Sequence, residues 1–369
     1  MAIYLEKIRI NSYRGISDLS IDGLNHVNLI VGDNNCGKTS ALESVLLLRA
    51  PSELSNLLRI SRIREYGFYR PSEYECFINM FSKESKEKKI EVAGIVNKKR
   101  LSCKVEGKIT KVLLDPDDNR MFFWAGSFQN GTARNSLSED EANAFIGRVL
   151  FSTFNKTGSE EVIFSEYSSA AGMQIGTKDL LKINYFSPFS YLDEKIIGHI
   201  LKDEEYKREC LENIKLFDPE IDDFSVARDE ETGRLVEYIH HKRMGNMPVS
   251  TYGDGIKKVL SLSAAIAKTK DGILLIDEIE TSIHSKHYAS VFSFLLRAAK
   301  QFDVQLFITT HSIEALDCIL ELQRYEESRT CDMISVITLK KEENRTYSRV
   351  LTGKRTFEDR ENFGFEVRL

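Results

Sequence analysis

The chain has 369 residues, of which 42% are hydrophobic, so it can bury one large core or two smaller ones. This composition excludes disordered and fibrous proteins. The net charge of −5 gives no global positive field, which argues against tight non-specific binding of nucleic acid by the whole surface. The cysteines lie far apart without a CxxC pair, so neither a zinc site nor a disulfide framework is indicated.

The N-terminal segment carries charges where a signal peptide has an apolar core. No apolar run approaches the roughly 18 residues that are needed to span a bilayer. We therefore expect a cytoplasmic protein without a membrane partner.

The first fifty residues predict a strand, a glycine-rich loop and a helix. Residues 3–10 alternate apolar and polar side chains, and residues 27–31 form a short apolar run, so both are predicted to be strands. The run that begins at Gly37 has helical spacing and meets no helix breaker before Pro51.

The middle of the chain is less regular. Residues 73–114 predict strands joined by tight turns, with separate strands at 100–105 and 108–114. Residues 126–180 are rich in Ser, Gly, Asn and Thr and predict one helix near 138–150.

Beyond that region, residues 193–217 have helical periodicity, and the residues after them predict a hairpin that turns near Thr232–Gly233. The last third predicts a helix from about Ile256, a strand at 272–276, a helix at 284–300 and a strand at 304–309.

This alternation predicts an α/β fold with a mixed, largely parallel sheet flanked by helices. Residues 1–50 and 245–369 would then form one discontinuous core. Residues 51–244 would form an inserted lobe, rich in strands and partly helical, that offers a surface to a partner or to nucleic acid.

The strongest motif lies between the second predicted strand and the first predicted helix, and it satisfies GxxxxGK[ST]. The glycines let backbone N–H groups face phosphates, Lys38 pairs with the β and γ oxygens, and the Thr39 hydroxyl can ligate Mg²⁺. A chance match in a glycine loop is the alternative, and the strand–loop–helix context weighs against it. The predicted phosphate-binding residues are Gly32, Asp33, Asn34, Asn35, Cys36, Gly37, Lys38, Thr39 and Ser40.

A second motif supplies acidic groups. Residues 272–278 form an apolar strand that ends in Asp277 and Glu278. Asp277 is predicted to support the magnesium ion with Thr39, and Glu278 to act on the attacking water. A core strand that happens to end in two acids is the alternative reading, and the preceding phosphate loop favours the functional one.

A third motif repeats this pattern. Residues 304–312 form an apolar strand that ends in polar residues, and His311 would lie at the same edge of the sheet. A neutral imidazole there could bond the γ-phosphate or water. We predict that Lys38, Glu278 and His311 are the catalytic residues.

A glycine-rich turn, Ser250 to Lys257, leads into another helix, whose N-terminus offers a second anion site. The phosphate loop already surrounds one face of a nucleotide, so this turn should serve a second ATP. A plain turn before a helix is the alternative. The predicted contacts are Ser250, Gly253, Asp254 and Gly255.

Together the four motifs resemble those of ABC-type ATPases of the SMC, RecF and OLD (overcoming lysogenization defect) lineage. The resemblance covers the first fifty residues and 247–315 well. It implies ATP and Mg²⁺ as cofactors, and two heads that dimerise head to tail, so that the glycine turn of one copy caps ATP on the phosphate loop of the other.

The resemblance also assigns further residues. Arg14 matches a basic residue near the nucleotide, and Glu280, Thr281, Ser282 and His284 match a segment that crosses the dimer interface. Gly253 stands where the family has a serine whose hydroxyl contacts the γ-phosphate. In this chain that hydroxyl is missing, or Ser250 or Thr251 supplies it. The glutamine that joins the two lobes has Gln129 and Gln174 as candidates.

The inserted lobe lacks the long heptad arms of a chromosome clamp, and the residues after His311 are too few for a Toprim nuclease. The chain thus resembles a stand-alone OLD-like ATPase of bacterial anti-phage systems such as PARIS or Septu. This implies an ATP-dependent sensor or scaffold that controls a separate effector protein.

The alternative is a DNA-binding repair ATPase like RecF, with nucleic acid as the partner. Residues 83–111 hold ten basic side chains, which could track phosphate or simply lie solvated on hairpins. They are Lys83, Lys86, Lys88, Lys89, Lys98, Lys99, Arg100, Lys104, Lys108 and Lys111. A transporter ATPase is disfavoured by the size of the insertion.

Overall fold

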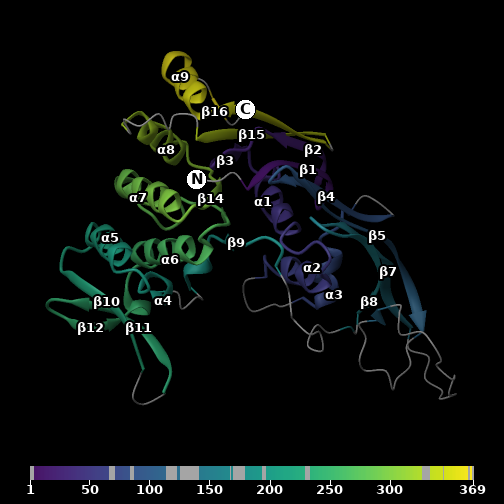
Figure 1. Ribbon diagram of the computed structural model, residues 1–369, viewed down its shortest axis with the longest axis horizontal. Helices are drawn as coiled ribbons and strands as arrows, with labels where there is room; N and C mark the ends of the chain where they lie inside the picture. Colours follow the sequence, from purple (N-terminus) through teal and green to yellow (C-terminus); the bar gives the residue numbers. More distant parts are fainter. Residues whose placement is uncertain are drawn as a thin grey trace.

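The described residues of the computed structural model form two large β-sheets and one small sheet, with helices between and around them (Figure 1). The structure describes residues 4–65, 71–83, 87–113, 123–124, 141–166, 168, 179–192, 197–228, 233–325, 333–343, 345–364 and 366–367.

The central sheet has six strands, and all of them are parallel except one edge strand, which runs antiparallel. Its order is β16 (Arg345–Thr352), β15 (Ile334–Glu342), β3 (Val27–Gly32), β14 (Gln305–Thr309), β13 (Ile273–Ile276) and β9 (Ile183–Phe186). The expected fold class, a mixed and largely parallel sheet flanked by helices, is confirmed.

Both faces of this sheet are buried at its central strands, because β3, β13 and β14 are buried at every position. Leu274 and Ile276 of β13 belong to one hydrophobic core, whereas Ile273 and Leu275 belong to the other. The first core also holds α4 (Ile197–Ile200), α5 (Glu204–Lys215), α6 (Asp254–Thr269), α7 (Tyr288–Gln301) and α8 (Ile313–Tyr325). The last helix, α9 (Gly353–Phe363), follows β16.

The second core lies between the central sheet and a seven-stranded antiparallel sheet, with three helices inside it. Those helices are α1 (Lys38–Leu46), α2 (Leu54–Ser61) and α3 (Glu73–Ile78). The sheet runs β2 (Ile16–Asp22), β1 (Leu5–Tyr13), β4 (Lys88–Val96), β5 (Lys99–Leu113), β7 (Glu141–Ser152), β8 (Thr157–Ser165) and β6 (Phe123–Trp124).

Two local expectations are wrong in this sheet. The helix predicted near 138–150 is instead the strand β7, in which Ala142, Ala144, Val149 and Phe151 are buried. The helix-forming residues of that segment are overruled by pairing along the length of β5 and β8. The separate strands at 100–105 and 108–114 are one strand, β5, which runs unbroken through Gly107.

The sheets also cross the expected limits of the inserted lobe. Strand β4 pairs with β1, and β9 pairs with β13, so hydrogen bonds join residues on both sides of positions 50 and 245. The division into a core and an inserted lobe stays a prediction.

The small sheet leads into the glycine turn. It contains β10 (Ile221–Arg228), β11 (Leu235–His241) and β12 (Gly245–Pro248), and the predicted hairpin is the antiparallel pair β10 and β11. The 3₁₀ helix η4 (Val249–Thr251) then connects β12 to α6. The helix predicted at 193–217 is two helices, α4 and α5. Among the helices of the described residues, none is long and apolar enough to cross a membrane.

Candidate functional site

Three polar segments meet at one edge of the central sheet. Strand β14 lies between β3 and β13, and all three are parallel, so their carboxyl ends share that edge. The loop of residues 32–39 follows β3, Asp277 follows β13, and Thr309 ends β14.

The loop after β3 has a backbone that only certain residues accept. Gly32 has φ of 142°, Asn35 of 63° and Gly37 of 101°, all in the left-handed region. A Cβ atom on Gly32 would lie 2.2 Å from the carbonyl oxygen of Leu339, so the strand pairing excludes any other residue there. The turn then delivers Lys38 as the first residue of α1.

The predicted phosphate-binding residues differ in exposure. Asp33, Asn34 and Asn35 are exposed at the tip of the loop, while Cys36 and Ser40 are buried. Lys38 is 4% exposed, and its Nζ donates to the carbonyl oxygens of Gly32 (2.8 Å) and Asp33 (2.7 Å). Burial lowers the pKa of Lys38. The loop therefore curls around a single ammonium group.

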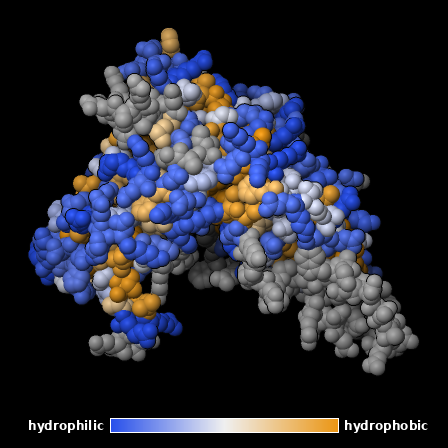
Figure 2. Space-filling model, in the orientation of Figure 1, coloured by the Kyte–Doolittle hydropathy of each residue, from blue (hydrophilic) through white to orange (hydrophobic). Residues whose placement is uncertain are grey.

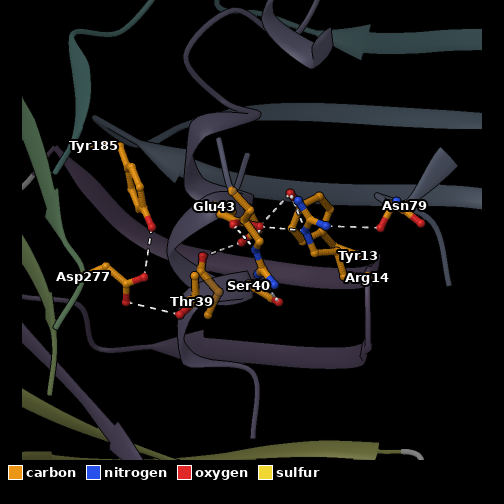
Figure 3. A network of polar contacts seen from close by, with 11 residues as sticks. Tyr13, Arg14, Thr39, Ser40, Glu43, Asn79, Tyr185 and Asp277 are labelled. Atoms are coloured by element: carbon orange, nitrogen blue, oxygen red, sulfur yellow. Dashed lines mark hydrogen bonds and ion pairs between the residues drawn. The ribbon is translucent and has the colours of Figure 1, made fainter. Parts of the chain in front are cut away.

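An oxygen-rich cluster surrounds Asp277 (Figure 3). Its Oδ1 accepts hydrogen bonds from Thr39 Oγ1 at 3.2 Å and from Thr309 Oγ1 at 2.5 Å, and its Oδ2 accepts one from Tyr185 OH at 2.9 Å. Carboxylate and hydroxyl oxygens are the ligands that Mg²⁺ prefers, so Asp277 and Thr39 fit this ion.

Glu278 and His311 lie beside this cluster. Glu278 has φ of 49°, and its N–H donates to Thr309 Oγ1 at 2.8 Å, which fixes this left-handed residue at the edge. Its Oε1 lies 3.5 Å from Nε2 of His311, and both side chains are about two-fifths exposed. The pair thus faces solvent at the edge, where a water molecule can reach it.

A buried carboxylate holds two arginines near the loop (Figure 3). Glu43 of α1 has no exposed surface and accepts from Tyr13 OH at 3.1 Å, Arg14 Nε at 2.7 Å and Arg64 Nε at 2.5 Å. Arg64 also donates to Ser40 Oγ at 3.0 Å. Burial opposes the charge of Arg14, but the charges of Tyr13 and Glu43 outweigh it and raise the pKa of Arg14.

These arginines line a cavity of about 690 Å³ that opens beside the loop. Four cationic side chains contribute to its wall, which suits an anionic ligand. Its charged and loop residues are Arg14, Arg64, Lys83, Lys341, Asn35, Cys36, Gly37 and Ser40.

The glycine turn of residues 250–255 is largely exposed. Ser250, Gly253 and Asp254 are exposed, and among the described residues no hydrogen bond or ion pair joins residues 250–255 to the loop of residues 32–39. A Cβ atom on Gly253 would meet nothing within 4 Å, whereas one on Gly255 would lie 3.1 Å from Phe217. The turn is thus open to solvent on one side.

Two side chains of the segment after Glu278, which was expected at a dimer interface, make contacts within the chain. Oε1 of Glu280 accepts a hydrogen bond from the His311 N–H at 2.7 Å, and Ser282 Oγ lies 2.9 Å from Tyr191 OH. The two candidates for the bridging glutamine, Gln129 and Gln174, lie outside the described residues.

Several residues of the site were not predicted. Arg64, Tyr185 and Glu43 reach it only through tertiary packing, and no motif marks them. Thr309 is adjacent to the predicted His311 and could have been found, because a hydroxyl at the end of β14 must face the residue that ends β13.

A separate cluster of Asp218, Glu220 and His241 does not suit a metal ion. Nδ1 of His241 accepts two backbone N–H groups, each at 3.2 Å, so in the neutral ring the proton is on Nε2. That Nε2 lies 3.4 Å from Asp218 and 3.5 Å from Glu220. The ring therefore offers these carboxylates a proton instead of offering a metal a lone pair.

Known protein families match the chain. A family model described as "AAA domain, putative AbiEii toxin, Type IV TA system" matches residues 113–317, which is more than half of the chain. A second model, described as "AAA ATPase domain", matches residues 3–180. The chain therefore belongs to the AAA-domain ATPase family.

Individual proteins are similar to this chain over most of its length. The chain is 22% identical over 394 residues to an ATP/GTP phosphatase of Helicobacter pylori, covering 97% of this chain and 99% of that one. It is 24% identical over 365 residues to the DNA replication and repair protein RecF of Clostridium beijerinckii, covering 86% and 95%.

A solved SMC head bound to the C-winged helix domain of ScpA has a similar fold, with a TM-score of 0.50 at 12% identity, over 96% of this chain and 100% of that one. The chain is therefore an AAA-domain ATPase that is similar to RecF in sequence and to an SMC head in fold.

Proposed function

We propose that this chain binds ATP with magnesium at the edge formed by β3, β13 and β14, and hydrolyses it there. The observation that carries the proposal is the meeting of Lys38, Thr39 and Asp277, which join a curled, cationic loop to a buried carboxylate. Lys38 and the loop N–H groups bind the phosphates, and Thr39 and Asp277 hold the ion. Magnesium, when bound, neutralises charge that develops on the phosphate oxygens.

Glu278 orients the attacking water in this mechanism. Its backbone is fixed by Thr309, and its carboxylate shares a 3.5 Å contact with His311, so the two side chains can hold one water between them and the γ-phosphate. On the other side of the loop, Arg14 and Arg64 would bind anionic parts of the nucleotide in the cavity.

Hydrolysis further requires a second copy of the chain, in our proposal. The turn of residues 250–255 is largely exposed, it shares no hydrogen bond or ion pair with residues 32–39 among the described residues, and it lies at the positive end of α6. In a head-to-tail dimer, Ser250, Gly253, Asp254 and Gly255 would approach the ATP of the other copy.

We further propose that the dimer is an OLD-like sensor or scaffold that controls a separate effector protein in bacterial anti-phage defence. The family description supports a system with a partner, since it names a putative toxin of a type IV TA system. A protein partner is also bound to the similar SMC head. Figure 2 shows apolar atoms over part of the small sheet. Leu235 and Met244, near opposite ends of β11, are each 54% exposed. The small sheet is a candidate surface for the effector.

DNA binding, as in a RecF-like repair ATPase, is the second candidate. The RecF relatives favour it, and so does the exposed turn between β4 and β5 with Lys98, Lys99 and Arg100. Other basic residues of this region are engaged within the chain: Lys89 pairs with Glu91, Lys104 with Glu106, and Lys111 with Glu141. These ion pairs favour solvated hairpins over a phosphate track, so the sensor remains the leading proposal.

Two substitutions test the proposed reaction. Lys38→Ala should abolish ATP binding, measured by fluorescence with a labelled ATP. Glu278→Gln should bind ATP with near-normal affinity and hydrolyse it about 100-fold more slowly, because it removes the group that positions water and leaves the phosphate loop intact. Normal turnover in Lys38→Ala would contradict the proposed function, and normal turnover in Glu278→Gln would contradict the role of Glu278.

A further inference from the structure

Helix α6 carries a buried lysine that lacks a hydrogen-bond acceptor. Lys258 has no exposed surface, and its Nζ has no partner among the described residues. The ammonium lies 5.1 Å from the ring centre of Phe186 and 5.8 Å from that of Tyr191. Contacts with two aromatic rings offset only part of the cost of removing an ammonium group from water. A methionine would fill the same space without that cost.

The charges that act on Lys258 come from the candidate catalytic edge. Burial lowers the pKa of Lys258 to about 8, and the carboxylates of Glu280, Glu278 and Asp277 oppose this shift. All three carboxylates follow β13. The ring of Tyr191 lies 5.8 Å from the ammonium, and its OH lies 2.9 Å from Ser282 Oγ in the same segment, so the ammonium lies close to the residues that follow β13.

Glu280 connects that segment to His311. Its Oε1 accepts the His311 N–H at 2.7 Å, while its Oε2 is buried without a hydrogen-bond partner among the described residues. An ammonium without an acceptor and a carboxylate oxygen without a donor are therefore buried near the same turn. A purely structural role does not explain the buried ammonium, because an apolar side chain would be more stable in its place.

We propose that Lys258 is a positioning residue for ATP hydrolysis, which acts through Glu280 to hold His311 beside Glu278. This inference rests on the proposed function, and it adds a link to the glycine turn. Helix α6 begins at Asp254, directly after the N-cap Gly253, and reaches Lys258 one turn later. When the turn of one chain contacts ATP on a second copy, α6 would transmit this contact to Glu280, and so to the site where the first chain hydrolyses its own ATP.

The test compares Lys258→Met, Glu280→Gln and the double variant in steady-state hydrolysis of MgATP and in thermal unfolding. We expect kcat of Lys258→Met to fall at least about tenfold with KM within about twofold of wild type, because positioning is lost and binding is kept. The melting temperature should stay equal or rise. The double variant should be no slower than the slower single variant, since Lys258 is proposed to act through Glu280.

Lys207→Met is the matched control. Lys207 of α5 also lies over a ring, 5.6 Å from that of Phe224, but it is paired with Asp223 at 2.7 Å and lies away from the edge. Its kcat should stay at the wild-type value.

A normal kcat in Lys258→Met, a fall in kcat matched by a lower melting temperature, or multiplicative losses in the double variant would each overturn the proposal. Different results contradict the role of Lys258 and the proposed function. Inactive Lys38→Ala with fully active Lys258→Met would sink only the role of Lys258, whereas active Lys38→Ala would sink the proposed function itself.

Discussion

Glu43 illustrates how one buried side chain can organise a binding surface. Its carboxylate has no exposed area, yet it forms ion pairs with Arg14 and Arg64, whose side chains are 13% and 41% exposed. Both arginines line the cavity and reach Glu43 from that side. Removing this acceptor would leave both guanidinium groups misplaced.

We therefore predict that Glu43→Gln raises KM for ATP about tenfold and lowers kcat less, because an amide offers one acceptor in place of two. Stability should fall by about 3 kcal/mol, as is typical when one partner of a buried ion pair is lost. Chemical denaturation and steady-state kinetics measure these two effects. Tyr13→Phe, which removes a single donor to the same carboxylate, is the control and should change KM less than about twofold. An unchanged KM in folded Glu43→Gln would count against the nucleotide role of the arginines.

At the scale of residues, the sequence predicts what depends on local spacing. Gly32, Lys38 and Thr39 are found because phosphate binding needs those residue types at those intervals. Glu43, Arg64 and Lys258 are not found, because their partners lie 19 or more residues away and only the packing of α1 and α6 brings them together.

The turn between β4 and β5 belongs to the scale of elements. Asn97 and Lys98 have φ of 48° and 62°, so this two-residue hairpin loop holds its basic side chains outward in a fixed conformation. Charge reversal of Lys98, Lys99 and Arg100 to Glu should leave folding intact and should not change ATP turnover. The turn bonds to Tyr4, which contacts Gln305 at the end of β14 opposite to Thr309.

Binding of duplex DNA distinguishes a sensor without DNA contact from a RecF-like ATPase. If the chain is a sensor without DNA contact, the wild type and the reversed variant should both bind a 30-base-pair duplex too weakly to detect at physiological salt. Salt-dependent binding by the wild type that disappears in the variant would instead favour the RecF-like alternative.

Elements between about 256 and 309 were predictable, since buried runs such as 273–276 and 305–309 alternate with helical periods, whereas the helices and strands from Ile313 onward were not predicted. Strand β7 was not, because its Ala, Glu and Asn residues favour other structures until β5 and β8 pair with it. Strand β9 was missed too, because it contributes only four residues to the edge of the central sheet.

The central sheet carries one candidate phosphate-binding element on each of its two faces. One face packs α1, which carries the phosphate loop, and the other packs α6, which carries the glycine turn (Figure 1). Among the described residues, no hydrogen bond or ion pair joins these two candidate anion sites within one chain. In the proposed dimer, the turn of one copy would instead approach the loop of the other.

The mass of Glu278→Gln in solution, measured by light scattering with and without MgATP, tests this account most directly. The variant keeps bound ATP unhydrolysed, so we predict a shift from one chain mass to two when MgATP is added, and no shift in Lys38→Ala. A mass that stays at one chain when ATP saturates Glu278→Gln would contradict the account.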